Sequence, residues 1–141
     1  MEIFELKKIT EEVLDAFQNL IPQLDTSCKI PTREDLKTII SNENTFVFMA
    51  KNDTIFGALT LVIYNIPTGK KAWIEDVVVD KNIRGQGIGA KLIEYAINFS
   101  KNIGIEKLDL TSRPSRVAAN ELYKKLGFEL RETNVYRKSL S

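Results

Sequence analysis

The sequence of 141 residues predicts a single α/β domain, residues 1–141, built on a mixed, mostly antiparallel sheet of six to seven strands flanked by about four helices. Three successive runs rich in β-branched and aromatic residues, between residues 45 and 79, are typical of an antiparallel meander. Residues 72–111 read as strand, helix and strand, and such a crossover makes its two strands parallel if they are neighbours in one sheet. The length suits one core and is short for two ordinary domains.

The first 44 residues are predicted to hold one strand and two helices. Residues 2–8 form the strand, and Thr10 caps a helix with apolar residues at helical spacing, which Pro22 interrupts or kinks. Pro31 and Thr32 begin a second helix. Asp35, three residues after Thr32, resembles the acid of a capping box.

The rest of the chain is predicted to alternate strands with two further helices. Strands at 45–51 and 55–64 are joined by a turn at 52–53, and a turn at 67–69 leads into a strand that ends at Val79. A helix to about residue 102, a strand at 106–111 and a helix at 115–126 follow, the last closed by Gly127. Two final strands are expected at 128–132 and 134–138.

Composition excludes several classes of function. Lys plus Arg is 20 against 19 for Asp plus Glu, without a basic stripe interleaved with aromatics, so nucleic acid is not an expected partner. The chain has no histidine and one cysteine, Cys28, which excludes Ser-His-Asp and Cys-His hydrolysis, an internal disulfide and a cysteine-rich zinc site. No metal is expected, and acid–base chemistry falls to carboxylates, tyrosine, lysine, a chain end or ordered water.

Targeting signals are not recognisable in the sequence. The first residues read as an amphipathic strand rather than a signal peptide, and no apolar run approaches the length of a membrane span. We therefore expect a cytoplasmic protein without a membrane partner.

Residues 84–89, Arg-Gly-Gln-Gly-Ile-Gly, join an apolar strand to an amphipathic helix with little side-chain bulk. Glycines let main-chain N–H groups approach an anion, at the positive end of a helix dipole. The loop therefore predicts a pyrophosphate site. Ala90-Lys91 stands where a nucleotide-hydrolysing P-loop needs Lys-Ser or Lys-Thr, and the third glycine comes one position early for the dinucleotide fingerprint.

The loop does match R/Q-x-x-G-x-G/A through Arg84, Gly87 and Gly89, and so resembles the acyl-coenzyme A loop of the GNAT acetyltransferase superfamily. Residues 119–128, Ala-Asn-Glu-Leu-Tyr-Lys-Lys-Leu-Gly-Phe, resemble the second signature of that family, A-x-x-L-Y-x-x-x-G-F. The order of predicted elements resembles the GNAT fold over essentially the full chain. The resemblance implies an acetyl-CoA-dependent N-acetyltransferase with acetyl-CoA as co-substrate.

The resemblance also implies which residues contact the cofactor. Main-chain donors near the glycine loop hold the pyrophosphate, with Arg84 adding charge at its edge, unless that side chain simply lies on the surface. The strand before the loop offers backbone groups to the pantetheine arm, and Asn120 contacts the thiol end, although many members carry their Asn earlier, where this chain has Arg116. The expected cofactor-binding residues are Val77, Val78, Val79, Arg84, Gly85, Gln86, Gly87, Ile88, Gly89, Ala90 and Asn120.

Two residues are expected to be catalytic. Glu75 resembles the carboxylate that some members use, directly or through water, to take a proton from the amine, and Tyr123 occupies the family position that protonates the departing thiolate. A phenol stays protonated at neutral pH and can donate as charge grows on sulfur. Asp76 and Arg113 are candidate substrate contacts. Alternatives stay open: buried structural acids at 75 and 76, a packing role for Tyr123 and a solvated Arg113.

The predicted function is transfer of an acetyl group from acetyl-CoA to a primary amine by direct attack in a ternary complex, since no neighbouring histidine activates Cys28 as an acyl carrier. The acceptor is a small molecule or a peptide amine, as in protein N-terminal or lysine acetyltransferases. From another class, a non-catalytic acyl-CoA sensor or interaction module remains an alternative. Oligomeric state, including a homodimer, and acyl chain length stay open.

Overall fold

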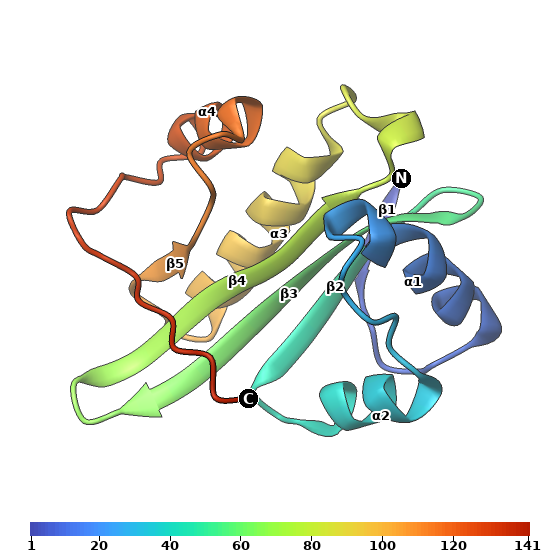
Figure 1. Cartoon of the computed structure of the whole chain (residues 1–141), viewed down its shortest axis with the longest axis horizontal. Coiled ribbons are helices and arrows are strands. Elements are labelled where there is room, and N and C mark those ends of the chain that lie inside the picture. Colours follow the sequence, from blue (N-terminus) through green and yellow to red (C-terminus); the bar gives the residue numbers. More distant parts are fainter. The chain divides into compact units, whose positions relative to one another are not determined.

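The computed structural model describes residues 1–141, which divide into two compact units, Met1–Thr111 and Ser112–Ser141. The first unit contains one five-stranded sheet (Figure 1). Its strands are β1 (Glu2–Glu5), β2 (Thr45–Lys51), β3 (Ile55–Ile66), β4 (Gly69–Val79) and β5 (Leu108–Leu110), in that spatial order. Strands β1 to β4 pair antiparallel, and β4 pairs with β5 in parallel. The predicted meander and parallel crossover are confirmed, with five strands instead of six to seven.

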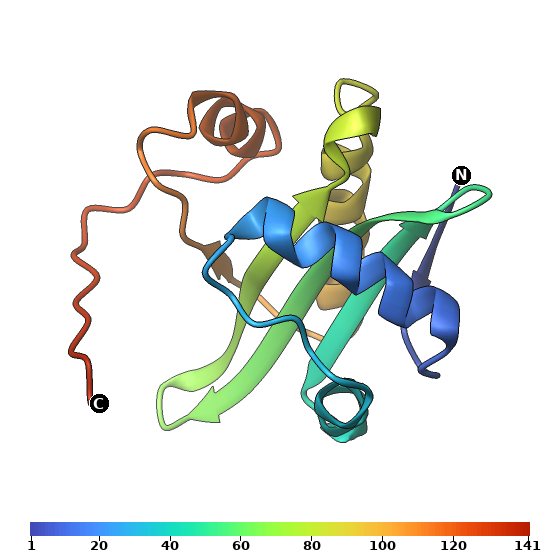
Figure 2. The ribbon, with the colours of Figure 1, turned by 45° about the vertical axis from the view of Figure 1, so that its right-hand side comes forward.

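Helices cover both faces of the sheet (Figure 2). On one face, α1 (Glu11–Leu24) and α2 (Arg33–Ser41) bury Leu20 and Leu36 in a core that includes Met49 of β2 and Val78 of β4. On the other face lies α3 (Ile88–Asn102), whose Leu92, Ile93 and Ala96 are fully buried. Phe48 of β2 packs its ring 5.1 Å from that of Phe99 in α3. Full burial of a side chain such as Phe48 contributes roughly 1.5–3 kcal/mol to the free energy of unfolding.

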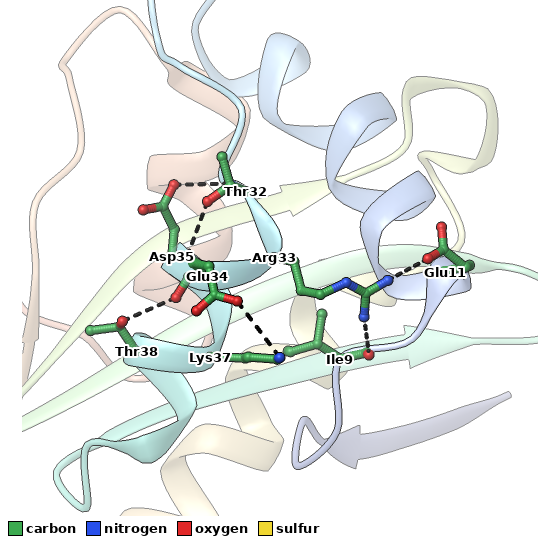
Figure 3. Close-up of polar contacts among 8 residues, drawn as sticks. All are labelled: Ile9, Glu11, Thr32, Arg33, Glu34, Asp35, Lys37 and Thr38. Carbon is green, nitrogen blue, oxygen red and sulfur yellow. Dashed lines mark hydrogen bonds and ion pairs between the residues drawn. The ribbon is translucent and has the colours of Figure 1, made fainter.

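The two N-terminal helices begin at the predicted caps. Thr10 Oγ1 accepts a hydrogen bond from Val13 N at 3.3 Å. Thr32 Oγ1 accepts from Asp35 N at 3.1 Å, and Asp35 Oδ2 accepts from Thr32 N at 2.9 Å, so the predicted capping box is complete (Figure 3). Each cap satisfies a backbone donor that the first helical turn leaves free.

Arg33 ties the start of α2 to the start of α1 (Figure 3). Its Nη1 donates to the carbonyl of Ile9 at 2.9 Å, and its Nη2 pairs with the carboxylate of Glu11. The guanidinium thus fixes the angle between the helices with a planar pair of donors.

Pro22 is predicted to interrupt or kink helix α1; the interruption is wrong, since α1 continues through Pro22 to Leu24. A proline removes one N–H donor, and here it stands in the last turn. Helical hydrogen bonding continues after the proline, because Asp25 N donates to the Ile21 carbonyl at 3.2 Å. Leu20 at 0% exposure anchors this end of the helix against the sheet.

The second unit contains α4 (Val117–Lys125) and an extended tail. Helix α4 starts two residues later and ends one residue earlier than expected, with Leu126 as its C-cap and Gly127 next at φ of +94°. The two strands predicted at 128–132 and 134–138 are wrong, because this segment pairs with no other strand. Leu130 and Tyr136 are 93% and 88% exposed. An alternating sequence forms a strand only where a neighbour accepts its backbone hydrogen bonds.

Three strands are shorter or longer than predicted. Strand β1 ends at Glu5 instead of residue 8, and β5 occupies three residues instead of six. Strand β3 extends to Ile66, two residues beyond the prediction.

Candidate functional site

The glycine loop adopts a backbone that favours glycine. Gly85 and Gly87 have φ of +87° and +74°, in the left-handed region. Gly87 is also the N-cap of α3, and no side chain caps this helix. The first helical hydrogen bond is Lys91 N to the Gly87 carbonyl at 3.1 Å, so the N–H groups of residues 88–90 have no partner within the helix. This end of α3 therefore offers converging donors and a positive dipole to an anion.

The space beside the two glycines is open. A Cβ added at Gly85 or Gly87 would meet no protein atom within 4 Å, so protein crowding does not account for these glycines. Their positive φ values do, because they turn main-chain groups outward. The backbone at both glycines is therefore open to an approaching ligand.

The pairing of β4 with β5 ends several residues before the glycine loop begins. Its pairing with β5 ends at Ile74 and Leu110, whereas on the other side β4 stays paired with β3 as far as Val79 and Gly57. Residues 75–79 thus have no strand partner on the β5 side within residues 1–111. An amide-rich chain can hydrogen-bond to such an open strand edge. Val78 is buried in the core, and Val77 and Val79 are half-buried.

A bulge in β4 lies at the two acidic residues Glu75 and Asp76. Thr60 of β3 pairs with Glu75, but Ala58 pairs with Val78, so two residues of β4 stand opposite Leu59. Asp76 takes φ of +50°, the single non-glycine residue with positive φ. The regular alternation of side chains between the two faces of a strand is therefore interrupted at Asp76. Both acids are exposed, which also corrects the alternative that they are buried structural acids.

The surroundings of Glu75 shift its titration. Desolvation by neighbouring groups raises the pKa of the Glu75 carboxyl, and the nearby charge of Asp76 raises it further. A hydrogen bond from the side chain of Trp73, two residues earlier on the same face, opposes part of this rise in pKa. A raised pKa makes Glu75 a better proton acceptor when it is ionised.

The C-terminal half of α1 contacts residues 80–81, between β4 and the glycine loop, through polar side chains that sequence reasoning missed. Asn19 Nδ2 donates to Asp80 Oδ2 at 2.9 Å, and Gln23 Oε1 accepts from Lys81 N at 2.8 Å. The Asn82 backbone N–H and then the Asn19 amide lower the pKa of Asp80. The only sequence signal is that these residues lie on the polar face of a helix, which does not distinguish them from solvated residues.

These same contacts border an open cleft of about 520 Å³ lined by Gln18, Asn19, Pro22, Gln23, Lys81 and Arg84. Arg84 is exposed, and its Nε donates to the Val79 carbonyl at 3.2 Å. The guanidinium is thereby held at the junction of β4 and the loop.

The second unit holds the other predicted residues. Tyr123 is 7% exposed, and its ring lies edge-on to Phe128 with centroids 6.1 Å apart. Asn120 Nδ2 donates to the carbonyls of Arg113 and Arg116 at 2.9 and 2.8 Å, so the amide supports the first turn of α4. Only its Oδ1 is left to accept a bond from a ligand. Arg113 is exposed.

Comparison with known proteins decides the family. The model of the Acetyltransferase (GNAT) family matches residues 6–128, which include the glycine loop, the β4 acids and the Tyr123 signature. The chain belongs to the GNAT acetyltransferase family. The resemblance inferred from the two motifs is confirmed.

Relatives of this GNAT chain carry N-acetyltransferase names. It is 28% identical to the uncharacterised N-acetyltransferase YhdJ of Bacillus subtilis over 96% of this chain and 99% of that protein. It is 40% identical to an uncharacterised N-acetyltransferase of Methanocaldococcus jannaschii, and 35% to the thialysine N-epsilon-acetyltransferase of Sus scrofa. These two matches cover about half of this chain, 50% and 46%, and only 31% and 38% of the relatives.

Solved structures agree on the fold. A putative acetyltransferase from Agrobacterium tumefaciens has a TM-score of 0.85 at 20% identity, covering 99% of this chain and all of that one. An aminoglycoside acetyltransferase from an uncultured soil sample has a TM-score of 0.81 at 26% identity, covering 99% and 95% of the two chains. No helix of this GNAT chain is long and apolar enough to cross a membrane, and no three metal-binding side chains converge.

Proposed function

We propose that this protein is an N-acetyltransferase that transfers the acetyl group of acetyl-CoA to a primary amine by direct attack in a ternary complex. One observation carries the proposal: an uncapped helix N-terminus, preceded by two left-handed glycines, follows a strand whose edge is open. That geometry suits a ligand with a diphosphate at one end and amides along its length.

The donor contacts are proposed from this geometry. The N–H groups of residues 86–90 hold the pyrophosphate, and Arg84 contributes charge beside it. Backbone groups of Val77, Val78 and Val79 pair with the pantetheine arm, and Asn120 accepts a hydrogen bond through Oδ1. When bound, acetyl-CoA supplies an activated acyl thioester.

Proton transfer is assigned to Glu75 at the acceptor end. An amine must lose a proton before its nitrogen can attack, and it is mostly protonated at neutral pH. The Glu75 carboxylate, exposed beside the β4 bulge, accepts that proton directly or through water. Asp76 holds the ammonium group before transfer and keeps the pKa of Glu75 raised. The bond from nitrogen to the carbonyl carbon then forms, the carbon–sulfur bond breaks, and the nitrogen loses its second proton to water, which leaves a neutral amide.

The leaving sulfur needs a proton, which Tyr123 is proposed to donate from its phenol oxygen. Packing against Phe128 holds the ring in one orientation, as a proton donor requires. Arg113, exposed at the start of the second unit, is proposed as a contact for the acceptor.

The acceptor is left at the level of a primary amine. Relatives are named for thialysine, for glucosamine 6-phosphate and, in N-alpha-acetyltransferase 30, for protein α-amines. Each match covers between 30% and 65% of this chain, so their names support an amine acceptor without selecting one.

Release of free thiol from acetyl-CoA tests the proposal. Purified protein is incubated with acetyl-CoA and a panel of small amines, amino acids and peptides, and thiol is measured with and without each amine. Release that depends on an amine supports the transferase. Binding of acetyl-CoA without release for any amine would favour a non-catalytic acyl-CoA sensor.

A further inference from the structure

The two faces of the β3–β4 hairpin are buried to different extents. Facing α3, Leu61 and Ile63 of β3 are 0% and 4% exposed, and Ala72 and Ile74 of β4 are 1% and 3% exposed. On the opposite face, the residues of the same strands are half-buried or exposed, namely Thr60, Val62, Tyr64, Lys71, Trp73 and Glu75. The core under α1 and α2 contains none of them. Within residues 1–111, no element covers this end of the sheet (Figure 2).

The strand register orders these side chains into two adjacent rows. Thr60 pairs with Glu75, Val62 with Trp73 and Tyr64 with Lys71. Paired residues share a face, and alternate residues along one strand lie in a row. The row on β4 therefore runs from the carboxylate of Glu75, across the indole of Trp73, to the ammonium of Lys71.

The charges at the two ends of this row are opposite and separated. Four residues of extended chain place the Cα atoms of Lys71 and Glu75 about 13 Å apart. Neither residue forms a salt bridge with the other or with any other residue. Trp73 and Val62 lie between them and provide an apolar surface.

We propose that the acceptor is an amine that also carries an anionic group, lying along this row with its nitrogen at Glu75 and its anion at Lys71. This inference rests on the proposed function. The middle of the molecule packs on Trp73 and Val62, and the indole face favours a nearby ammonium group. Lys71 is thus a specificity-determining residue, whereas Glu75 acts on the reacting nitrogen.

A pair of acceptors that differ only in the anion tests the role of Lys71. The probes are ω-aminooctanoate and octylamine, and kcat/KM is measured for each with wild type, Lys71→Gln and Lys71→Glu. Lys70→Gln is the matched control, because Lys70 is the exposed neighbour that points to the other face. The preference for the carboxylate over the plain amine should fall by about fivefold in Lys71→Gln, the upper range for an exposed ion pair, and further in Lys71→Glu.

The control and the plain amine define the outcome. Lys70→Gln should keep the wild-type preference and the wild-type kcat/KM with octylamine. Raising the ionic strength should reduce the preference in wild type and Lys70→Gln, and should have little effect in Lys71→Gln. An unchanged preference in Lys71→Gln, in a protein that acetylates amines, would overturn the inference and leave the proposed function standing.

A binding measurement that needs no turnover separates failure of the proposed function from failure of the inference about Lys71. Trp73 is the only tryptophan in the chain, so its fluorescence reports ligands on this face. Addition of ω-aminooctanoate should change the emission of wild type and Lys70→Gln at lower concentration than that of Lys71→Gln. If no amine supports thiol release, the proposed function fails, and this titration alone decides the inference: equal curves for all three proteins would overturn it.

Discussion

The pKa of the Glu75 carboxyl is raised first by desolvation and second by the charge of Asp76, which lies at a bulge in β4. In a regular strand, Asp76 would point to the face opposite Glu75 and leave it without an acidic neighbour. The bulge, with Asp76 at positive φ, instead brings a charge that raises the Glu75 pKa together with desolvation. The sequence predicted both acids as candidates, but a bulge depends on hydrogen-bond registry with β3, which no residue pattern in β4 reveals.

The pH dependence of turnover tests Glu75. A base works only when ionised, so kcat/KM should rise with pH through the raised pKa of Glu75 and level off above it. Asp76→Asn removes a charge that raises this pKa, and the rising limb should therefore move to lower pH. Glu75→Gln should abolish the limb and lower kcat about a hundredfold.

Glu94→Gln, an exposed acid on α3, is the control for Glu75 and should keep the wild-type profile. A profile for Glu75→Gln that matches wild type would remove the residue from its role.

Tyr123 is tested by removing its hydroxyl alone. Tyr123→Phe keeps the packing against Phe128 and should lower kcat about a hundredfold, because the leaving sulfur loses its acid. Affinity for acetyl-CoA, measured by calorimetry, should stay within about twofold, since the phenol acts on charge that develops during reaction. Tyr95→Phe, a half-buried tyrosine on α3, should leave kcat unchanged. Equal kcat for Tyr123→Phe and wild type would assign Tyr123 to packing.

At the scale of elements, local signals predicted where helices begin better than where strands exist. Thr10 and Thr32 mark helix starts because their side chains satisfy backbone donors three residues away. Strand 128–132 had the right alternation, yet it has no partner in the structure. A cap needs only its own turn, whereas a strand needs a neighbour that is distant in sequence.

The capping box of α2 gives a stability prediction. Thr32→Ala should lower the free energy of unfolding at neutral pH by about 1 kcal/mol, because Asp35 N loses its acceptor. Hydrogen bonds from the Thr32 backbone and side chain hold the Asp35 pKa below its usual range. That contribution is present above the unfolded-state pKa and disappears as pH falls through the folded-state pKa.

Urea unfolding at neutral and acidic pH measures both parts. Thr38→Ala, within the same helix and exposed, is the control and should change the free energy of unfolding by much less. A Thr32→Ala protein as stable as Thr38→Ala at neutral pH would contradict a stabilising cap.

At the scale of the molecule, the sequence predicted the order of elements as far as α4, and it predicted the family from two motifs, residues 84–89 and 119–128. It could not predict the contacts of Asn19 and Gln23 with the loop, because those depend on how α1 crosses the sheet. The site roles of Glu75, Tyr123 and the loop remain predictions, as do the single domain and the cytoplasmic location. Each role depends on residues far apart in sequence acting on one ligand.

The account depends most on the glycine loop binding acetyl-CoA, and calorimetric titration of acetyl-CoA into three proteins tests this directly. Wild type and Gly104→Ala should bind with similar affinity, and Gly87→Ala should bind at least about tenfold more weakly, because backbone strain of 1–3 kcal/mol there distorts the cradle. Gly104 is a matched control, with φ of +83° and no atom within 4 Å of an added Cβ. Absence of binding to wild type, or equal affinity for Gly87→Ala and Gly104→Ala, would contradict the account.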